Sequence, residues 1–243
     1  MDLLIDVAEW FGDADQWSGP NGIPNRTIEH LRLSGMSLAA AAAIAIPLAL
    51  VLGHIRGFAN LSIPVVNIAR AIPSFAIIAL ALPFSIRAGL GIGFWPTFLA
   101  LVLLAVPPIF TNAFTGVQSA ERPLIEAGRG MGMRSTEIML QLEMPLAAPL
   151  IITGLRIAAV QVVATATLGA LVGWGGLGRY IIDGFSVQDN VRVFAGALLV
   201  AALSIATDLA FGVLQRYVSP ERRYQLQKSD SLAEPAVQAH GGA

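Results

Sequence analysis

Residues 33–53 read Leu-Ser-Gly-Met-Ser-Leu-Ala-Ala-Ala-Ala-Ala-Ile-Ala-Ile-Pro-Leu-Ala-Leu-Val-Leu-Gly. The run contains no charged side chain and is dominated by Ala, Ile and Leu. A helix that crosses a lipid bilayer needs about 20 mostly apolar residues. This stretch is long enough, so it predicts a membrane-spanning helix.

Four more stretches of the chain have the same character. They cover residues 61–86, 94–117, 145–172 and 191–213. Their apolar residues form continuous runs, whereas membrane β-strands alternate polar and apolar residues over about ten positions. The sequence therefore predicts an all-α, polytopic membrane protein with about five transmembrane helices.

The composition of the whole chain supports this class. Of the 243 residues, 55% are hydrophobic and only 13% are charged, and the mean hydropathy is +0.68. A soluble domain carries about 25% charged residues, so too little charge is present for a polar surface. A net charge of −1 gives no reason to expect a nucleic-acid partner. The absence of Cys excludes disulfides and thiolate metal sites.

The basic residues of the short loops set the expected orientation, because Lys and Arg are enriched on the cytoplasmic side. With the N-terminus outside and the C-terminus in the cytoplasm, eight basic residues fall inside and five outside. The inside residues are Arg56, Arg122, Arg129, Arg134, Arg216, Arg222, Arg223 and Lys228. The outside residues are Arg26, Arg32, Arg87, Arg179 and Arg192.

The two ends of the chain differ from its centre. Residues 1–25 are predicted to form an extracytoplasmic segment that begins with a short helix at the membrane interface. This segment is acidic, so it is not a signal peptide. Residues 26–220 form the predicted transmembrane domain, and the polar residues 221–243 form a predicted flexible cytoplasmic tail.

No catalytic or metal-binding pattern emerges from the sequence. The three His residues lie in different regions, and we expect neither a metal nor a cofactor. The single Lys of the chain, Lys228, follows no Gly-rich turn and cannot belong to a P-loop. Residues 173–178 match the dinucleotide pattern GxGxxG, but they follow a long apolar helix and are predicted to form a flexible hairpin at the outer surface. Any ATP hydrolysis must therefore take place on another chain.

The longest internal polar stretch lies between the third and fourth spans, at residues 119–145. Pro123 suits the first turn of a helix, and glycines 128, 130 and 132 allow a sharp turn after it. Ser135 is placed to cap a second short helix. A simple connector needs only a few residues. The predicted helix-turn-helix therefore favours a docking element over a plain connector, which is the alternative interpretation.

This loop resembles the EAA motif of ABC-importer permeases, in which Glu-Ala-Ala is followed after three residues by Gly and after nine more by Ile-x-Leu-Pro. Here the motif reads Glu126-Ala127-Gly128, then Gly132, then Leu142-x-Met144-Pro145. The substitutions at 128, 142 and 144 remain small or apolar. Stretches 70–75, 125–133 and 175–181 further resemble the permeases of the glycine betaine, carnitine and choline branch. The resemblance covers roughly residues 26–220.

The resemblance implies a type I ABC-importer permease fold with a cytoplasmic coupling helix in the 119–145 loop. The residues it assigns to coupling with the ATPase are Glu126, Ala127, Gly128, Arg129, Gly132 and Pro145. It implies three protein partners: an ATP-binding cassette subunit, an extracytoplasmic substrate-binding protein and a second permease chain, as a homodimer or a heterodimer. It also places the chain in the cytoplasmic, or inner, membrane.

Polar residues inside the spans are costly and often line a transport route. On the second span Asn67, Arg70 and Ser74 share one helical face. The third span carries Asn112 and Thr115, and the fourth carries Gln161 and Thr165. We expect these seven residues to line the pathway, with helix–helix hydrogen bonds as the alternative for each.

Two charged residues of the spans stand apart. Asp208 of the fifth span is expected to form a structural pairing, and Arg156 of the fourth to lie near the inner leaflet.

The expected function is import of osmoprotectants, such as glycine betaine, carnitine, choline or proline. The alternatives are a permease for another small solute such as an amino acid, a stand-alone secondary transporter, and a membrane enzyme or scaffold. Five spans without an inverted repeat weigh against the secondary transporter. The 18 aromatic residues form no evident cage for a quaternary ammonium, so the chain does not name its solute.

Overall fold

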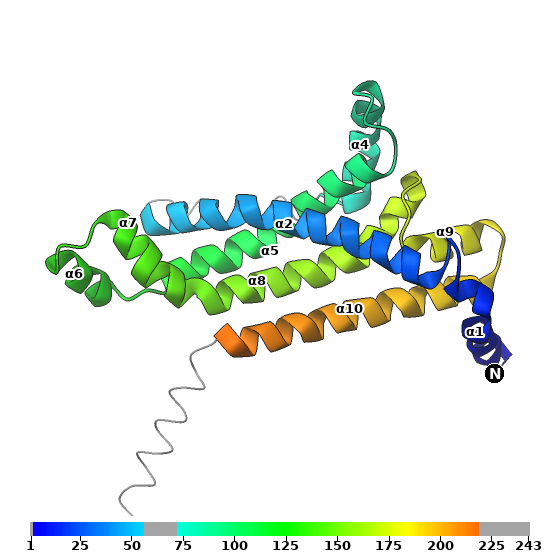
Figure 1. The fold of residues 1–243 in the computed structure, drawn as a ribbon. Coiled ribbons are helices and arrows are strands. Elements are labelled where there is room, and N and C mark those ends of the chain that lie inside the picture. The colour runs from blue at the N-terminus through cyan, green and yellow to red at the C-terminus, as the bar shows by residue number, and fades with distance from the viewer. Residues whose placement is uncertain (1, 56–71, 219–243) are drawn as a thin grey trace, which may run out of the picture.

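The computed structural model describes residues 2–55 and 72–218. Four long helical runs lie side by side in it: α2 (Ile23–Ile55), α5 (Phe94–Gln118), the run that contains α8 (Met144–Thr165), and α10 (Asn190–Val218) (Figure 1). All four are long and apolar enough to cross a membrane. They correspond to four of the five predicted spans. The all-helical fold class is confirmed.

The second predicted span is described only in part. Its second half forms α4 (Ser74–Arg87), which contacts α5 and projects to one side of the bundle (Figure 1). The first half, with Asn67 and Arg70, lies outside the described residues.

The short helices gather at the two ends of the bundle (Figure 1). At one end lie α6 (Arg122–Gly130) and α7 (Ser135–Ile138), together with the π-helical turn η2 (Met139–Glu143). At the other end lie α1 (Asp2–Gly12), the 3₁₀ turn η1 (Ala14–Trp17) and α9 (Gly178–Ser186). The 3₁₀ segment η3 (Ala166–Val172) extends α8 towards this second end. We call these the α6–α7 end and the α9 end.

Small residues bring the helices of the bundle close together at its core. Ala41, Ala45 and Ala49 recur every four residues along α2 and are fully buried against α5 and α8. Gly154 of α8 lies against the Pro108 carbonyl oxygen of α5, where an added Cβ would come within 2.9 Å. Helices in lipid gain little hydrophobic driving force from association, so close backbone contact at small residues supplies much of their packing energy. The Ala and Gly content of the spans therefore holds this bundle together.

Candidate functional site

The 119–145 loop has a small hydrophobic core of its own. Ala120, Ile125 and Ile138 are buried together, and Met133 and Leu142 pack against them. Gly128 lies inside this cluster, and an added Cβ would come within 3.0 Å of the Leu142 side chain. The loop is therefore a folded unit and not an extended connector.

A polar contact joins this loop to α2. Glu143 is 1% exposed, and its Oε2 lies 2.6 Å from Nδ1 of His54, in the last turn of α2. The other ring nitrogen of His54, Nε2, lies 2.6 Å from Oγ of Ser135 at the start of α7. A buried carboxylate is costly unless it is paired. His54 therefore both satisfies Glu143 and ties the loop to the end of α2.

The second helix of the loop differs from the prediction. Arg134, not Ser135, is its N-cap residue, and the Ser135 hydroxyl contacts His54 instead. The helix is also not separate, because α7 runs through η2 directly into α8. Pro145 lies in the first turn of α8 and lacks an N–H group. The wider turn of η2, where the Met144 N–H reaches back to the Met139 carbonyl, lets the helix pass into this proline.

The residues assigned to coupling occupy one end of the molecule but differ in exposure. Glu126, Ala127 and Arg129 are exposed on α6, and Gly132 is exposed in the turn that follows, whereas Gly128 is buried. Gly132 has φ +84°, a left-handed conformation that glycine adopts without strain.

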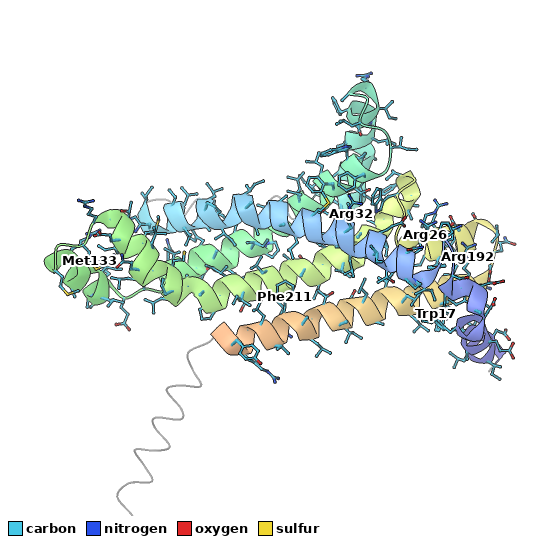
Figure 2. All side chains as sticks on the ribbon, viewed as in Figure 1. Trp17, Arg26, Arg32, Met133, Arg192 and Phe211 are labelled. Carbon is cyan, nitrogen blue, oxygen red and sulfur yellow. The ribbon has the colours of Figure 1, made fainter. Side chains whose placement is uncertain are left out.

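Apolar side chains are exposed beside these residues. Met131 is 76% exposed directly after α6, and Leu124 is exposed on α6. Met133, two residues further on, is labelled at this end in Figure 2. The loop thus presents charged and apolar groups together on a folded support.

The predicted pathway residues are only partly brought together. Ser74 of α4 and Gln161 of α8 line one pocket of about 140 Å³, which α5 closes with Pro107 and Pro108. Thr165 is half-buried at the end of α8, and Thr115 is exposed on α5. Ser74 and Gln161 are therefore the predicted pair that shares a cavity within the described part of the chain.

Asn112 makes its side-chain hydrogen bond within its own helix. Its side-chain amide donates to the Pro108 carbonyl oxygen at 2.8 Å, within α5 itself. Prolines 107 and 108 lack N–H groups and disturb the hydrogen-bond ladder of the helix. The missing N–H groups leave the carbonyls of Leu103 and Leu104 without their usual helical partners, whereas the Asn112 amide adds a bond one turn later.

Asp208 is paired, as predicted, and its partner is Arg156. Arg156 Nε and Nη2 each donate to one carboxylate oxygen of Asp208 at 2.6 Å, which joins α8 to α10. Arg156 therefore points towards α10. The two positions are 52 apart in the sequence, and no local pattern predicts that they meet.

The Gly-rich segment 173–178, which we call the glycine loop, is packed against the start of α2. The Gly176 N–H donates to Oε2 of Glu29 at 2.8 Å, and the same oxygen pairs with Arg26. Tyr180 donates its hydroxyl to the Asn21 carbonyl at 2.6 Å, and burial raises the pKa of this phenol, so it stays a donor. Arg26 and Arg192 mark this end in Figure 2. The glycine loop is thus held in place, whereas a flexible hairpin was predicted.

The sequence of residues 27–221 matches the family described as "Binding-protein-dependent transport system inner membrane component". The match covers most of the chain, including the 119–145 loop and the four long helices. The chain belongs to this family. It is therefore a membrane-embedded permease component of a transport system that works with a binding protein.

Curated relatives of the family support the same assignment. The chain is 34% identical over 203 residues to the choline transport system permease protein OpuBB of Bacillus subtilis, which covers 84% of this chain and 91% of the relative. It is 35% identical over 196 residues to the carnitine transport permease protein OpuCB of Listeria monocytogenes, covering 81% and 88% of the two chains. It is 32% identical over 195 residues to the osmoprotectant import permease protein OsmW of Salmonella typhimurium, covering 80% and 91%.

Solved structures share the fold of this permease. The inward-facing methionine ABC transporter MetNI contains a chain that superposes with a TM-score of 0.72 at 24% identity, covering 81% of this chain and 96% of that one. An amino acid ABC transporter crystallised with histidines gives a TM-score of 0.63 at 19% identity. These neighbours confirm the predicted type I permease fold.

Proposed function

We propose that this chain is the permease subunit of an ATP-driven importer for osmoprotectant solutes of the choline, carnitine and glycine betaine type. Its relatives are permeases for choline, carnitine and glycine betaine, which supports this solute class. In this assignment a binding protein delivers the solute at the α9 end, and ATP is hydrolysed by a separate subunit at the α6–α7 end. The N-terminus lies outside the cell and the C-terminus in the cytoplasm.

The observation that carries the coupling role is the construction of the 119–145 loop. Its own core keeps its shape, the His54–Glu143 contact ties it to α2, and its continuous helix leads into α8. A movement imposed on the exposed face of α6 is therefore passed to two membrane-spanning helices. Packed elements of this kind shift as units and do not deform continuously.

The exposed face of the loop fits a soluble partner. Glu126 and Arg129 supply charges that can form hydrogen bonds, and Met131 supplies an adaptable apolar contact. An exposed apolar side chain rimmed by polar groups is typical of a protein-binding surface. Ala127 and Gly132 carry little or no side chain, which lets a partner approach closely.

Translocation is assigned to the pocket that Ser74 of α4 and Gln161 of α8 line together. Asn67 and Arg70 are further candidates, on the same predicted span as Ser74. A second permease chain, identical or related, would complete the enclosure, because about five spans rarely enclose a pathway alone. Rocking of the two permeases around this route gives alternating access when the ATPases close.

Reconstitution tests the proposal. The chain is combined in proteoliposomes with its ATPase and its binding protein, and uptake of labelled choline, carnitine and glycine betaine is measured with and without ATP. We expect ATP-dependent uptake of at least one of these solutes. Uptake that follows an ion gradient in vesicles without an ATPase would instead support a secondary transporter and overturn the proposal.

A matched pair of variants tests the loop. Glu126→Ala removes an exposed charge at the α6–α7 end, and Glu9→Ala removes one at the α9 end. Both changes are at exposed positions, so each is expected to shift stability by less than about 0.5 kcal/mol. We expect Glu126→Ala alone to reduce solute-stimulated ATP hydrolysis. Equal effects of the two variants would contradict the assigned coupling surface.

A further inference from the structure

The Arg156–Asp208 ion pair lies in a pocket between α8 and α10. The pocket has a volume of about 490 Å³ and is also lined by Thr153, Gln161 and Gln215. Arg156 Nη1 donates to Gln215 Oε1 at 3.3 Å, and the Gln215 amide donates to the Thr153 hydroxyl at 3.0 Å. Polar groups of two membrane-spanning helices thus converge around one charged pair.

This pair is open to its surroundings. The side chain of Arg156 is 34% exposed and that of Asp208 is 41% exposed. Counted along the helices from the α6–α7 end, Arg156 lies about 18 Å into α8 and Asp208 about 15 Å into α10. Hydrocarbon cannot hydrogen-bond a charged group, and half-exposed ions within membrane-spanning helices are very costly against lipid. The open side of the pair must therefore face water or a polar molecule.

The pocket adjoins the proposed route. Gln161 lines both this pocket and the smaller one that contains Ser74. Thr153, Ile157 and Gln161 follow one another every four residues, so they share one face of α8. A solute that passes Gln161 therefore comes next to Arg156 and Asp208.

The guanidinium has capacity for a second acceptor. Among the described residues, its bonds to Asp208 and Gln215 engage three N–H groups. A guanidinium carries five, so two remain for a further acceptor such as a carboxylate. Asp208 in turn presents carboxylate oxygens that attract a cation.

We propose that Arg156 and Asp208 form a solute-binding site for a zwitterion that carries a carboxylate and a quaternary ammonium. Arg156 binds the carboxylate of the solute, and Asp208 faces the ammonium. Without solute the two side chains stay bonded to each other, so neither charge is left unpaired. The pocket volume falls within the range of small-molecule sites. This inference rests on the proposed import function.

The test compares two solutes in the complete reconstituted transporter. Glycine betaine carries both charges, whereas choline carries the ammonium and a hydroxyl but no carboxylate. Arg156→Lys keeps the positive charge and removes the fork that binds a carboxylate through two parallel bonds. We expect the maximal uptake rate at saturating binding protein to fall about tenfold for glycine betaine and less than twofold for choline. Arg192→Lys is the same substitution at the α9 end. It is expected to leave the ratio of the glycine betaine uptake rate to the choline uptake rate unchanged.

A second variant keeps the test decisive if Arg156→Lys assembles poorly. The double variant Arg156→Gln/Asp208→Asn removes both charges and leaves no unpaired ion, and it is expected to lose selectivity between the two solutes. If the pair is purely structural, every variant will lower the uptake rates of both solutes equally. That result would overturn this inference and leave the proposed function standing. A wild-type transporter that moves choline but not glycine betaine would overturn this inference as well. A wild-type transporter that moves none of glycine betaine, choline and carnitine would overturn the proposed function.

Discussion

At each end of this permease a glutamate carboxylate makes the contact that involves α2, but its partner is a side chain at one end and a backbone N–H at the other. At the α6–α7 end the carboxylate of Glu143 is paired with His54 of α2, and at the α9 end the carboxylate of Glu29 on α2 binds the Gly176 N–H. The first contact joins two side chains and leaves the outer face of the loop exposed. The second joins a side chain to backbone that is packed closely on both sides. Close backbone packing tolerates less rearrangement than a contact between two side chains, so we call the α9 end the fixed end and the α6–α7 end the open end.

The largest expected effect is at the fixed end. An added Cβ at Gly178 would meet the backbone of Thr167, which cannot move aside as a side chain can. We expect Gly178→Ala to lower the free energy of unfolding by about 3 kcal/mol, through overpacking. Thermal unfolding of the purified chain in detergent measures this change.

The control for this prediction lies at the other end. Gly130 is in α6, and an added Cβ would meet nothing within 4 Å. Gly130→Ala is therefore expected to be neutral or to stabilise by up to about 1 kcal/mol, because alanine favours the helix. Similar losses at both positions would contradict the distinction between a fixed end and an open end.

The next effect concerns the link between the loop and α2. His54→Ala leaves the buried Glu143 carboxylate without this partner, and we expect a loss of about 2 kcal/mol in stability. Solute-stimulated ATP hydrolysis should fall with it, because the loop is no longer tied to α2. Both quantities are measured on the reconstituted complex.

A double variant separates the pair from the rest of the loop. His54→Ala/Glu143→Gln also replaces the carboxylate with a neutral amide, so part of the stability lost in His54→Ala should return. The stability change of the double variant minus the changes of the single variants His54→Ala and Glu143→Gln gives the coupling energy of the two residues. If the double variant loses as much as the sum of the two single variants, the contact does not act as a pair.

A smaller effect is expected at the turn of the loop. Gly132 has φ +84°, where a residue with a Cβ is strained by about 1–2 kcal/mol. Gly132→Ala should destabilise the chain by this amount, whereas Gly132→Asn should cost less because Asn adopts the left-handed conformation more readily. Thermal unfolding of the two variants tests the order, and an equal cost would show that the φ angle is not the cause.

The smallest effect is expected at Glu29. In Glu29→Gln the amide oxygen can still accept from the Gly176 N–H, and only the half-exposed ion pair with Arg26 is lost. Exposed ion pairs contribute little, so the expected loss is at most about 0.5 kcal/mol. A loss several times larger would mean that charge, and not backbone packing, holds the α9 end.

Much of the architecture could be predicted because it depends on local pattern. The apolar runs near residues 33–53, 94–117 and 191–213 are long enough to require helices in lipid, and the structure has them as α2, α5 and α10. The motif around Glu126 likewise depends on spacing, and it led to the family that the comparisons confirm. The error at Ser135 arose because the end of α2 competes for its hydroxyl, which local sequence does not reveal.

By itself the sequence determined the membrane class, the helical fold, the family and the absence of a P-loop, because each depends on composition, run length or motif spacing. Only the tertiary structure decided which polar residues meet. His54 and Glu143 are 89 positions apart, Arg156 and Asp208 are 52 apart, and Glu29 and Gly176 are 147 apart. A buried charge needs a partner, but which partner it has depends on how the helices pack.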